Sequence, residues 1–571
     1  MINQKTWIKV NQNLVAKAIG ELTFEQVLTP VLKGEKYHLT LASGVEYAFH
    51  GWMSVWDYLR VDAQTVTRNN KSVTSAAQFF IDSQAETKMD DIVLGNFLEE
   101  MHNTLFADQI ILEKNKDLSV QDIAGWDGEK LQTILNGHPK ILLNKGRIGW
   151  NSEDLKNYSP ESTESFQLHW LAVKNTLLEA PLSHELLHDS MEISQKEKLL
   201  SQLTAPKEYS ILPVHPWQWQ RFIQIQFAGL LSSGEMISLG VAGDFYRPQI
   251  SLRTLSNATR PEKLDIKLPL TILNTSAIRG LPAKAITKGQ EVSASLKQIC
   301  EEDSFLKSLG TEVLLEKAGA AFIHPDYQQV KEAPYRYHEY LGAIWRESAL
   351  SKTGTNEKAI ISSSLFHQDE NKKSLIGEMI RLSTLSPQEW LSAYFKVVVL
   401  PLYHLQLNYG VGMVSHGQNI ILKMKDMKPV GMILKDFQGD LRLSTELPKL
   451  GKKYFHESGA HLTRLPPHYL IHDLITGHFI TNLRFISAVM QESEGFPENV
   501  FYQILSGVIQ EYVSDKEIDQ RQNLLSPTLS RVLLNKVRFA IGYSDSAQRP
   551  LPILGTDLKN PLAFAGEERK L

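Results

Sequence analysis

Residues 410–440, GVGMVSHGQNIILKMKDMKPVGMILKDFQGD, are the most informative stretch for the fold, because a polar turn separates two apolar runs. The spacing predicts a β-hairpin with a first strand over residues 420–425 and a returning strand over residues 430–435. Residues 426–429, DMKP, form the turn in this interpretation. Together with long helix patterns elsewhere in the chain, the hairpin indicates a mixed α and β fold.

Asn419 and Asp436 flank the predicted hairpin. If the turn centres between Met427 and Lys428, both residues lie equally far from it, side by side at the open end of the strands, with His416 at the same mouth. A carboxylate and an amide oxygen suit Mg²⁺, which prefers hard oxygen ligands, and protein kinases hold their metal ions with an Asn and an Asp. The alternative is a surface hairpin whose polar ends face water, because Asp and Asn are common at strand ends.

A second cluster of polar side chains lies between residues 251 and 279. Arginine offers a planar fork to phosphate or carboxylate, lysine a point charge, and hydroxyls add neutral hydrogen bonds. Such a set could hold a polyphosphate, although strands with solvated polar faces have a similar composition. The sequence has no GxxxxGK[ST] or GxGxxG motif, so we expect neither a Walker nor a Rossmann phosphate loop. The cluster consists of Ser251, Arg253, Thr254, Lys267, Thr271, Asn274, Thr275, Ser276 and Arg279.

A third cluster lies in residues 137–150, GHPKILLNKGRIGW. His138, Lys145 and Arg147 could line an anionic pocket, and the glycines permit turns between them. A basic loop that is simply solvated would have the same residues. The cluster therefore supports an anion site only together with the other two.

Other segments give a coarse outline of the chain. Strand patterns dominate residues 208–330, and residues 390–406 predict a helix. Residues 333–348 predict an amphipathic helix. Residues 181–210 and 349–374 are rich in turn-forming residues and predict surface connections.

The composition is that of an ordinary globular protein, with 571 residues, 42% apolar, 22% charged and a net charge of -4. This balance gives no basic excess for nucleic acid. A single cysteine, Cys300, excludes an internal disulfide and most zinc sites. The N-terminus has no apolar core typical of a signal peptide, and no apolar run approaches the ~20 residues of a membrane span. We therefore expect a cytoplasmic protein without a membrane partner.

Six ordered motifs, spread over about 300 residues, together resemble the IucA/IucC family, the siderophore synthetases that work without a nonribosomal peptide template. The resemblance looks strongest to the aerobactin-synthase branch, on GHPKILLNKGRIGW with DAQT at residues 62–65 and APYRY at residues 333–337. One departure is that many members have a second His-Pro in the first motif, where this chain has Ile141-Leu142. The motifs are GHPKILLNKGRIG, VHPWQWQ, SLRTL, KLPLTILNTSAIRG, SHGQN and KDFQGD.

The resemblance implies an α+β cupped-hand architecture. Residues 1–145 would form an N-terminal thumb, residues 146–345 a mostly β fingers region that binds the phosphates, and residues 346–571 a palm with a kinase-like sheet. It also implies ATP and Mg²⁺ as cofactors. Members of such a family often form dimers, so a homodimer is one expected state.

The same resemblance implies roles for individual residues. Lys267, Arg279 and His416 would act in catalysis, and Asn419 and Asp436 would hold the metal ion. Weaker candidates for substrate contact are Lys145, Arg147, Gln418 and Gln438. The expected nucleotide-binding residues are His138, Ser251, Arg253, Thr254, Lys267, Thr275, Ser276, Arg279, His416 and Asn419.

The activity implied is an AMP-forming ligation. The enzyme would adenylate a carboxylate of a citrate monoamide, or a similar hydroxamate-bearing acid, and condense it with the amine of an N-hydroxy-N-acyl lysine or diamine. Three alternatives stay open at this point: a hydroxamate macrocyclase or oligomerising synthetase acting on a succinyl-hydroxydiamine, a kinase-like phosphotransferase for small molecules, and a catalytically silent nucleotide-binding scaffold.

Overall fold

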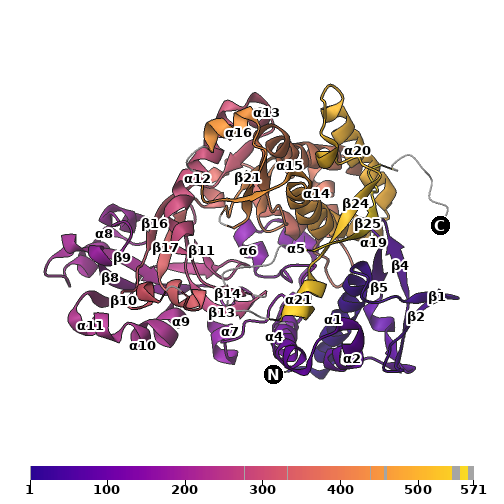
Figure 1. Cartoon of the computed structure of the whole chain (residues 1–571), viewed down its shortest axis with the longest axis horizontal. Helices are drawn as coiled ribbons and strands as arrows, with labels where there is room; N and C mark the ends of the chain where they lie inside the picture. The colour runs from indigo at the N-terminus through magenta and orange to yellow at the C-terminus, as the bar shows by residue number, and fades with distance from the viewer. Residues whose placement is uncertain are drawn as a thin grey trace.

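The computed structural model describes residues 2–275, 277–330, 332–437, 439–455, 459–542 and 553–563. It confirms the predicted α+β class, because mostly antiparallel sheets are packed against helices (Figure 1). Within these described ranges, no helix is both long and apolar enough to cross a bilayer.

The N-terminal part packs two long helices against a five-stranded sheet. The first helix, α1 (Gln4–Phe24), begins after Asn3, whose side chain accepts hydrogen bonds from the backbone amides of Lys5 and Thr6. The second, α4 (Asp91–Asn115), begins in the same way after Asp90. Their apolar faces and the sheet enclose one core. The strands in sheet order are β1 (Val31–Lys33), β2 (Lys36–Thr40), β3 (Glu46–Phe49), β6 (Thr67–Arg68) and β7 (Lys71–Ser72).

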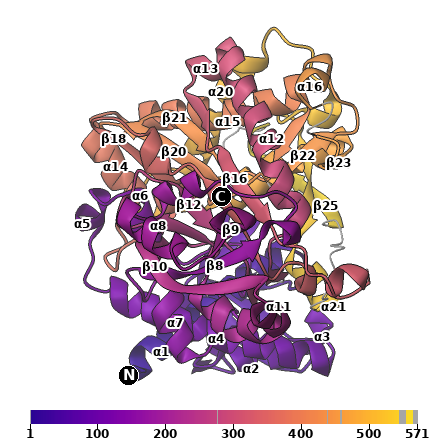
Figure 2. The ribbon, with the colours of Figure 1, turned by 90° about the vertical axis from the view of Figure 1, so that its left-hand side faces the viewer.

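The middle of the chain forms a seven-stranded antiparallel sheet, which lies in front in Figure 2, between the C-terminal sheet above and the N-terminal helices below. Apolar side chains from both of its faces are buried. The strands in sheet order are β16 (Glu316–Ala321), β17 (Gly342–Arg346), β12 (Asp265–Lys267), β11 (Thr254–Asn257), β10 (Met236–Pro248), β8 (Phe166–Lys174) and β9 (Tyr209–Val214).

Two predicted segments differ from the structure. The amphipathic helix expected over residues 333–348 is wrong, since the segment contains a short 3₁₀ turn, Tyr335–His338, and the strand β17. All five residues of β17 are buried because apolar clusters cover both faces of the strand, with Ala343 and Trp345 in one cluster and Ile344 in another, so its sequence lacks alternation. The connection expected over residues 349–374 contains β18 (Glu357–Ile361), which pairs with the hairpin.

The predicted hairpin lies in a four-stranded sheet with the order β15-β21-β20-β18, where β15 is Thr311–Val313. The first strand, β20 (Ile420–Lys425), is as predicted, but β21 (Lys428–Leu434) begins two residues earlier than expected. The loop consists of Asp426 and Met427 alone, with φ angles of 49° and 60°. Two successive left-handed residues are what a tight type I′ hairpin turn requires.

The shorter loop and the register shift between Lys423 and Met424 together displace the pairing at the open end of the hairpin by one residue. Ile420 pairs with Leu434, and continuing this register puts Asn419 opposite Lys435, and not opposite Asp436 as predicted. Both predicted site residues still leave the sheet at its open end. The long helix α15 (Pro387–Tyr409) covers the sheet within the largest core of the molecule.

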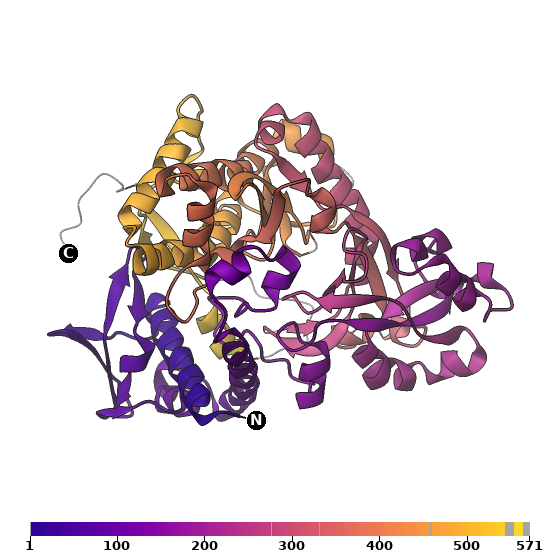
Figure 3. The same ribbon diagram turned by 180° about the vertical axis from the view of Figure 1, so that it is seen from behind.

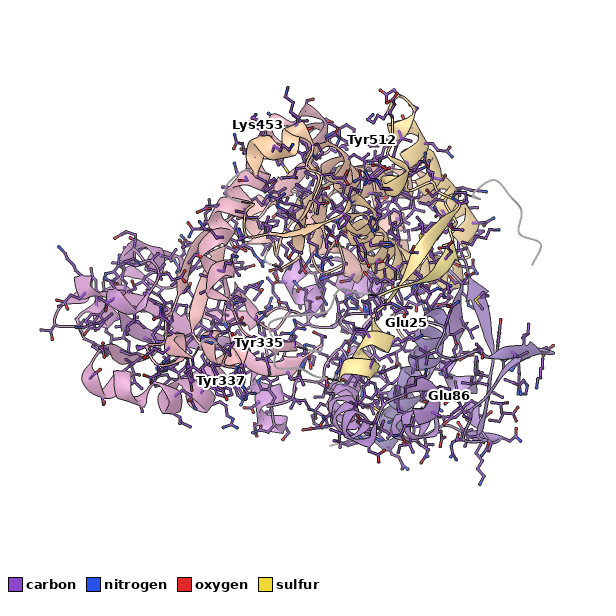
Figure 4. The ribbon with its side chains drawn as sticks, in the orientation of Figure 1. Glu25, Glu86, Tyr335, Tyr337, Lys453 and Tyr512 are labelled. Atoms are coloured by element: carbon purple, nitrogen blue, oxygen red, sulfur yellow. The ribbon has the colours of Figure 1, made fainter. Side chains whose placement is uncertain are left out.

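The N-terminal helix is tied to the C-terminal part by buried charges. The carboxylate of Glu25, labelled at this junction in Figure 4, accepts hydrogen bonds from the backbone amides of Asn535 and Lys536, at 3.0 and 2.8 Å. Glu21 accepts from Lys140 at 3.1 Å and from Arg484 at 2.6 Å. Segments from opposite ends of the chain therefore share one polar network.

Candidate functional site

A cavity of about 300 Å³ lies between the N-terminal part, the middle sheet and the hairpin sheet. These parts are the indigo, magenta and orange regions that meet in Figure 3. The cavity gathers predicted site residues from all three sequence clusters, which are up to about 300 residues apart. Those lining it are His138, Lys145, Arg147, Ser251, Arg253, Lys267, Thr275, Arg279, His416, Gln418, Asn419 and Asp436.

The loop before β20 orients Asn419. Its backbone amide donates to the carbonyl of His416 at 2.9 Å. Its side-chain nitrogen donates to the carbonyl of Val414 and to the carboxylate of Asp440, each at 3.0 Å. The two hydrogens of the amide nitrogen are used in this way, so the amide oxygen is the atom left to meet a ligand. Asn419 is 3% exposed and thus held by the fold.

Asp436 is the buried acceptor for two cations. Its Oδ1 accepts from Lys267 Nζ at 2.7 Å and from Arg346 Nη1 at 2.9 Å. Burial alone would raise the pKa of Asp436, but the positive charges of Lys267, Arg346 and Lys435 hold this pKa well below its usual range. The carboxylate is therefore ionised at every pH at which the protein is expected to work.

Arginine, lysine and hydroxyl groups form the opposite half of the cavity. Lys267 ends β12, and Arg279 ends β14 (Ala277–Arg279). The guanidinium of Arg253 donates to the carbonyl of Gly280, the residue that follows Arg279 in the sequence. This contact fixes the position of the guanidinium at the end of β14. The buried hydroxyl of Ser251 has no hydrogen-bond partner within the described residues. Cationic groups and a spare hydroxyl suit a phosphate.

Unusual backbone conformations surround the cavity. Four non-glycine residues there have positive φ angles: Arg147 (40°), Leu252 (68°), Thr275 (48°) and Asp436 (62°). Each such conformation costs on the order of 1–3 kcal/mol and persists only when its surroundings enforce it. Three of the four line the cavity, and Leu252 lies between two lining residues, Ser251 and Arg253. Strain is therefore concentrated at the place where the three clusters meet.

Two histidines lie next to each other in the cavity wall. The ring centroids of His138 and His416 are 5.7 Å apart, with the rings edge to face. Burial lowers the pKa of both rings, and for His138 the neighbouring His416, Lys17 and Lys140 lower it further. Both imidazoles are therefore neutral near pH 7 and can accept a proton.

Several predicted residues have other surroundings than expected. Thr254 does not line the cavity, because its side chain is 1% exposed within β11. Lys145 and Arg147 line the cavity but already pair with carboxylates, Lys145 with Asp108 at 2.7 Å and Arg147 with Glu161. The predictions for Ser276 and Gln438 fall outside the described residues.

Two residues have a place in the site that the sequence did not predict: Asp440 was not named, and Arg346 was only a candidate for substrate contact on the helix expected over residues 333–348. Asp440 lines the cavity and bonds to Asn419; it ends the quoted KDFQGD motif, so its position was visible in the sequence. Arg346 supports Asp436 from β17 and is 2% exposed. Only a correct strand assignment for residues 342–346 would have placed it there.

The donor set fits a magnesium ion that is partly coordinated by substrate. Asn419, Asp436 and Asp440 bring an amide oxygen and two carboxylates to the cavity, the hard oxygen ligands that Mg²⁺ takes. Among the described residues, no group of three or more His, Cys, Asp or Glu side chains is placed to hold a metal ion. An ion here would therefore depend on phosphate oxygens and water as well.

Comparisons with known proteins identify the family of the chain. The chain matches the IucA / IucC family over residues 129–367 and the ferric iron reductase FhuF-like transporter family over residues 388–546. An aerobactin synthase of Escherichia coli is 38% identical and covers 99% of this chain and 100% of its own. An aerobactin synthase of Vibrio mimicus is 37% identical, covering 99% and 98%. The solved structure of the aerobactin synthetase IucC from a hypervirulent pathotype of Klebsiella pneumoniae is 37% identical, with a TM-score of 0.88 and coverage of 99% and 100%.

Proposed function

Because this chain belongs to the IucA/IucC family, we propose that it is an ATP-dependent ligase of siderophore biosynthesis that forms an amide between a citrate-derived carboxylate and an amine. The main supporting observation is the composition of the central cavity. Its basic half, with Arg253, Lys267 and Arg279, shares the cavity with Asn419 and Asp436. One half suits the phosphates of ATP and the other a magnesium ion.

The first step is formation of a mixed anhydride. A carboxylate oxygen of the acid attacks the α-phosphorus of ATP, the bond to the β-phosphate breaks, and pyrophosphate leaves. Arg253, Lys267 and Arg279 offset the charge that develops on the phosphates, which is catalysis by positioning and electrostatics. Asn419 and Asp436 would hold Mg²⁺, which supplies further neutralisation of the phosphate charge.

The second step is attack by the amine. Its nitrogen forms a bond with the carbonyl carbon of the acyl-adenylate, and the bond to the phosphate oxygen breaks to release AMP. The amine must lose one proton. The neutral imidazole of His416 lines the cavity and can take this proton.

For the substrates we propose a citrate monoamide as the acid and an N-hydroxy-N-acyl lysine or diamine as the amine. The aerobactin synthases that resemble this chain over its full length support this choice. We propose in addition that the enzyme works in the cytoplasm, as a homodimer, and that residues 1–145, 146–345 and 346–571 act as thumb, fingers and palm.

The test is a product analysis with purified protein, ATP, Mg²⁺, a citrate monoamide and an N-hydroxy-N-acyl lysine. We expect pyrophosphate and AMP in equal amounts, and an amide of the summed mass less water. ADP with a phosphorylated small molecule would overturn the proposal in favour of a kinase. A product formed only from succinyl-hydroxydiamine would overturn the choice of substrates.

A matched pair of lysine variants tests the role of the cavity. Lys267→Ala removes a cation 2.7 Å from Asp436, and we expect the rate of pyrophosphate release to fall about 10²–10³-fold. Lys263→Ala removes a lysine four residues earlier that pairs only near the surface with Asp189, at 3.4 Å. It should change the rate by less than about 3-fold. Equal effects of both substitutions would contradict a phosphate-binding role for Lys267.

A further inference from the structure

A second cavity, of about 210 Å³, adjoins the first. His138 and His416 line both cavities, so the pair of rings lies at the boundary between them. The walls of the second cavity are mainly apolar and come from segments far apart in the sequence. The apolar lining residues are Val414, Leu465, Tyr469, Val532, Leu534 and Leu554.

Arg442, which lines this cavity together with its ion-pair partner Asp473, brings a positive charge to the wall. Its Nη1 donates to Oδ1 of Asp473 at 2.5 Å, which uses one of the five N–H donors of the guanidinium. Asp473 is 3% exposed and cannot move with the arginine toward solvent. The pair therefore fixes the guanidinium in the wall, and donors remain for a second anionic partner.

Strand geometry places Arg442 close to the first cavity. Arg442 belongs to β22 (Leu441–Ser444), and Gly412 is its partner in β19 (Val411–Met413). The amide of Val414 donates to the carbonyl of Asp440, which continues the pairing. Asp440 is the turn residue that directly precedes β22, so it is only two positions from Arg442 in the sequence. Asp440 lines the first cavity and Arg442 the second.

We propose that the second cavity binds the amine substrate and that Arg442 binds a carboxylate group of this amine. The inference rests on the proposed function and narrows it: the amine is an α-amino acid with a long side chain, and not a diamine. In an α-amino acid the carboxylate and the amine are on the same carbon. A carboxylate on Arg442 therefore holds the amine near the boundary of the two cavities, while the apolar walls accommodate the methylene arm.

This placement explains the position of the two histidines. The acyl-adenylate in the first cavity presents its carbonyl carbon at the boundary. The amine nitrogen forms its bond there, AMP leaves with the electron pair of the broken bond, and the released proton passes to one of the two imidazoles. His138 and His416 line both cavities and therefore lie at this position.

The experiment compares two amines that differ only in the α-carboxylate, an N6-acyl-N6-hydroxylysine and the corresponding N-acyl-N-hydroxy-1,5-diaminopentane. For Arg442→Gln we expect the ratio of kcat/KM, lysine-type amine over diamine, to fall about 10- to 100-fold, because a charge-assisted hydrogen bond is lost. Arg464→Gln is the matched control, because Arg464 lies on the neighbouring strand β23 (Thr463–Leu465) and does not line this cavity. It should leave the ratio unchanged.

Three results would overturn the inference. One is an unchanged kcat/KM ratio of the two amines in Arg442→Gln, with an unchanged KM for ATP. Another is an unchanged kcat/KM ratio with a raised KM for ATP, which would assign the cavity to the nucleotide. The third comes from Leu554→Trp, which fills the apolar wall: unchanged KM values for both amines would contradict binding there, whereas we expect both to rise. Failure of the proposed function has a separate signature, since wild-type protein would then show no carboxylate-dependent exchange of pyrophosphate into ATP in the absence of amine.

Discussion

Asp473 allows a quantitative test of the electrostatics behind this site, through the substitution Asp473→Asn. Its carboxyl is 3% exposed, and burial raises its pKa from 3.8 to about 7 despite the opposing effect of Arg442. In the unfolded chain the same group titrates near its ordinary value. The carboxylate therefore destabilises the folded protein wherever it is ionised.

The sign and size of the effect follow from proton linkage. The folded-state pKa of Asp473 lies above its unfolded value. The contribution of this group to the free energy of unfolding is therefore fully present below about pH 4 and is lost as the pH rises through about 7. A difference of roughly three pKa units corresponds to about 4 kcal/mol. Asparagine has nearly the same shape and can still accept from Arg442, but it does not titrate. We therefore expect Asp473→Asn to stabilise the protein, relative to wild type, by about 3 kcal/mol more at about pH 8.5 than at about pH 4.5, where part of the unfolded-state carboxyl is already ionised.

The assay is urea unfolding of wild type and variant across this pH range, followed by tryptophan fluorescence. Asp117→Asn is the matched control, since Asp117 is exposed, and it should shift the unfolding free energy by no more than about 0.5 kcal/mol at either pH. A difference between Asp473→Asn and wild type that stays constant with pH would refute the reasoning. So would a variant that becomes relatively less stable toward alkaline pH.

Three further outcomes can be checked. Because burial lowers the pKa of His416, kcat for amide formation at saturating amine, the step in which His416 takes the proton, should stay flat from about pH 8 to about pH 6.5, and an acid limb centred at the ordinary histidine pKa of about 6.5 would contradict this. Thr254→Val should leave pyrophosphate release unchanged within about 2-fold, because the buried Thr254 hydroxyl lacks a hydrogen-bond partner among the described residues; a large loss would show contact with substrate. Glu21→Ala leaves the buried Arg484 without its carboxylate partner, whereas Lys140 keeps Glu25 at 3.1 Å; it should cost about 3–5 kcal/mol in urea unfolding, so a cost below about 1 kcal/mol would be evidence against a structural role.

The hairpin shows how far periodicity can predict a fold. A short apolar run bounded by a polar turn was sufficient to locate β20. They did not fix the register, which depends on the loop. Asp426 and Met427 form a two-residue turn with positive φ angles, although neither is the glycine that such turns favour. Pro429 was therefore assigned to the turn, whereas it lies inside β21 beside a register shift.

The missed strand β17 has a different cause. Residues 342–346 are buried on both faces, and a short, continuously apolar run has neither the period of a helix nor that of a half-exposed strand. The error also affected the predicted site, because Arg346 is the last residue of this strand. Its role depends on a contact with Asp436, 90 positions away, which local sequence cannot indicate.

The candidate site was inferred from ordered motifs, and the structure shows which of their residues lie together. Asp436 and Lys267 come from different clusters and neutralise each other at 2.7 Å. Neither charge could be buried alone without a penalty of several kcal/mol. A polyphosphate with a divalent cation would give Lys267 an anion and Asp436 a cation at the same time, so the burial of both charges stays compensated when their mutual contact is lost. Arg346 remains on Asp436 throughout and keeps the carboxylate in place. The ion pair therefore keeps the two halves of the site ionised and positioned before the substrates arrive.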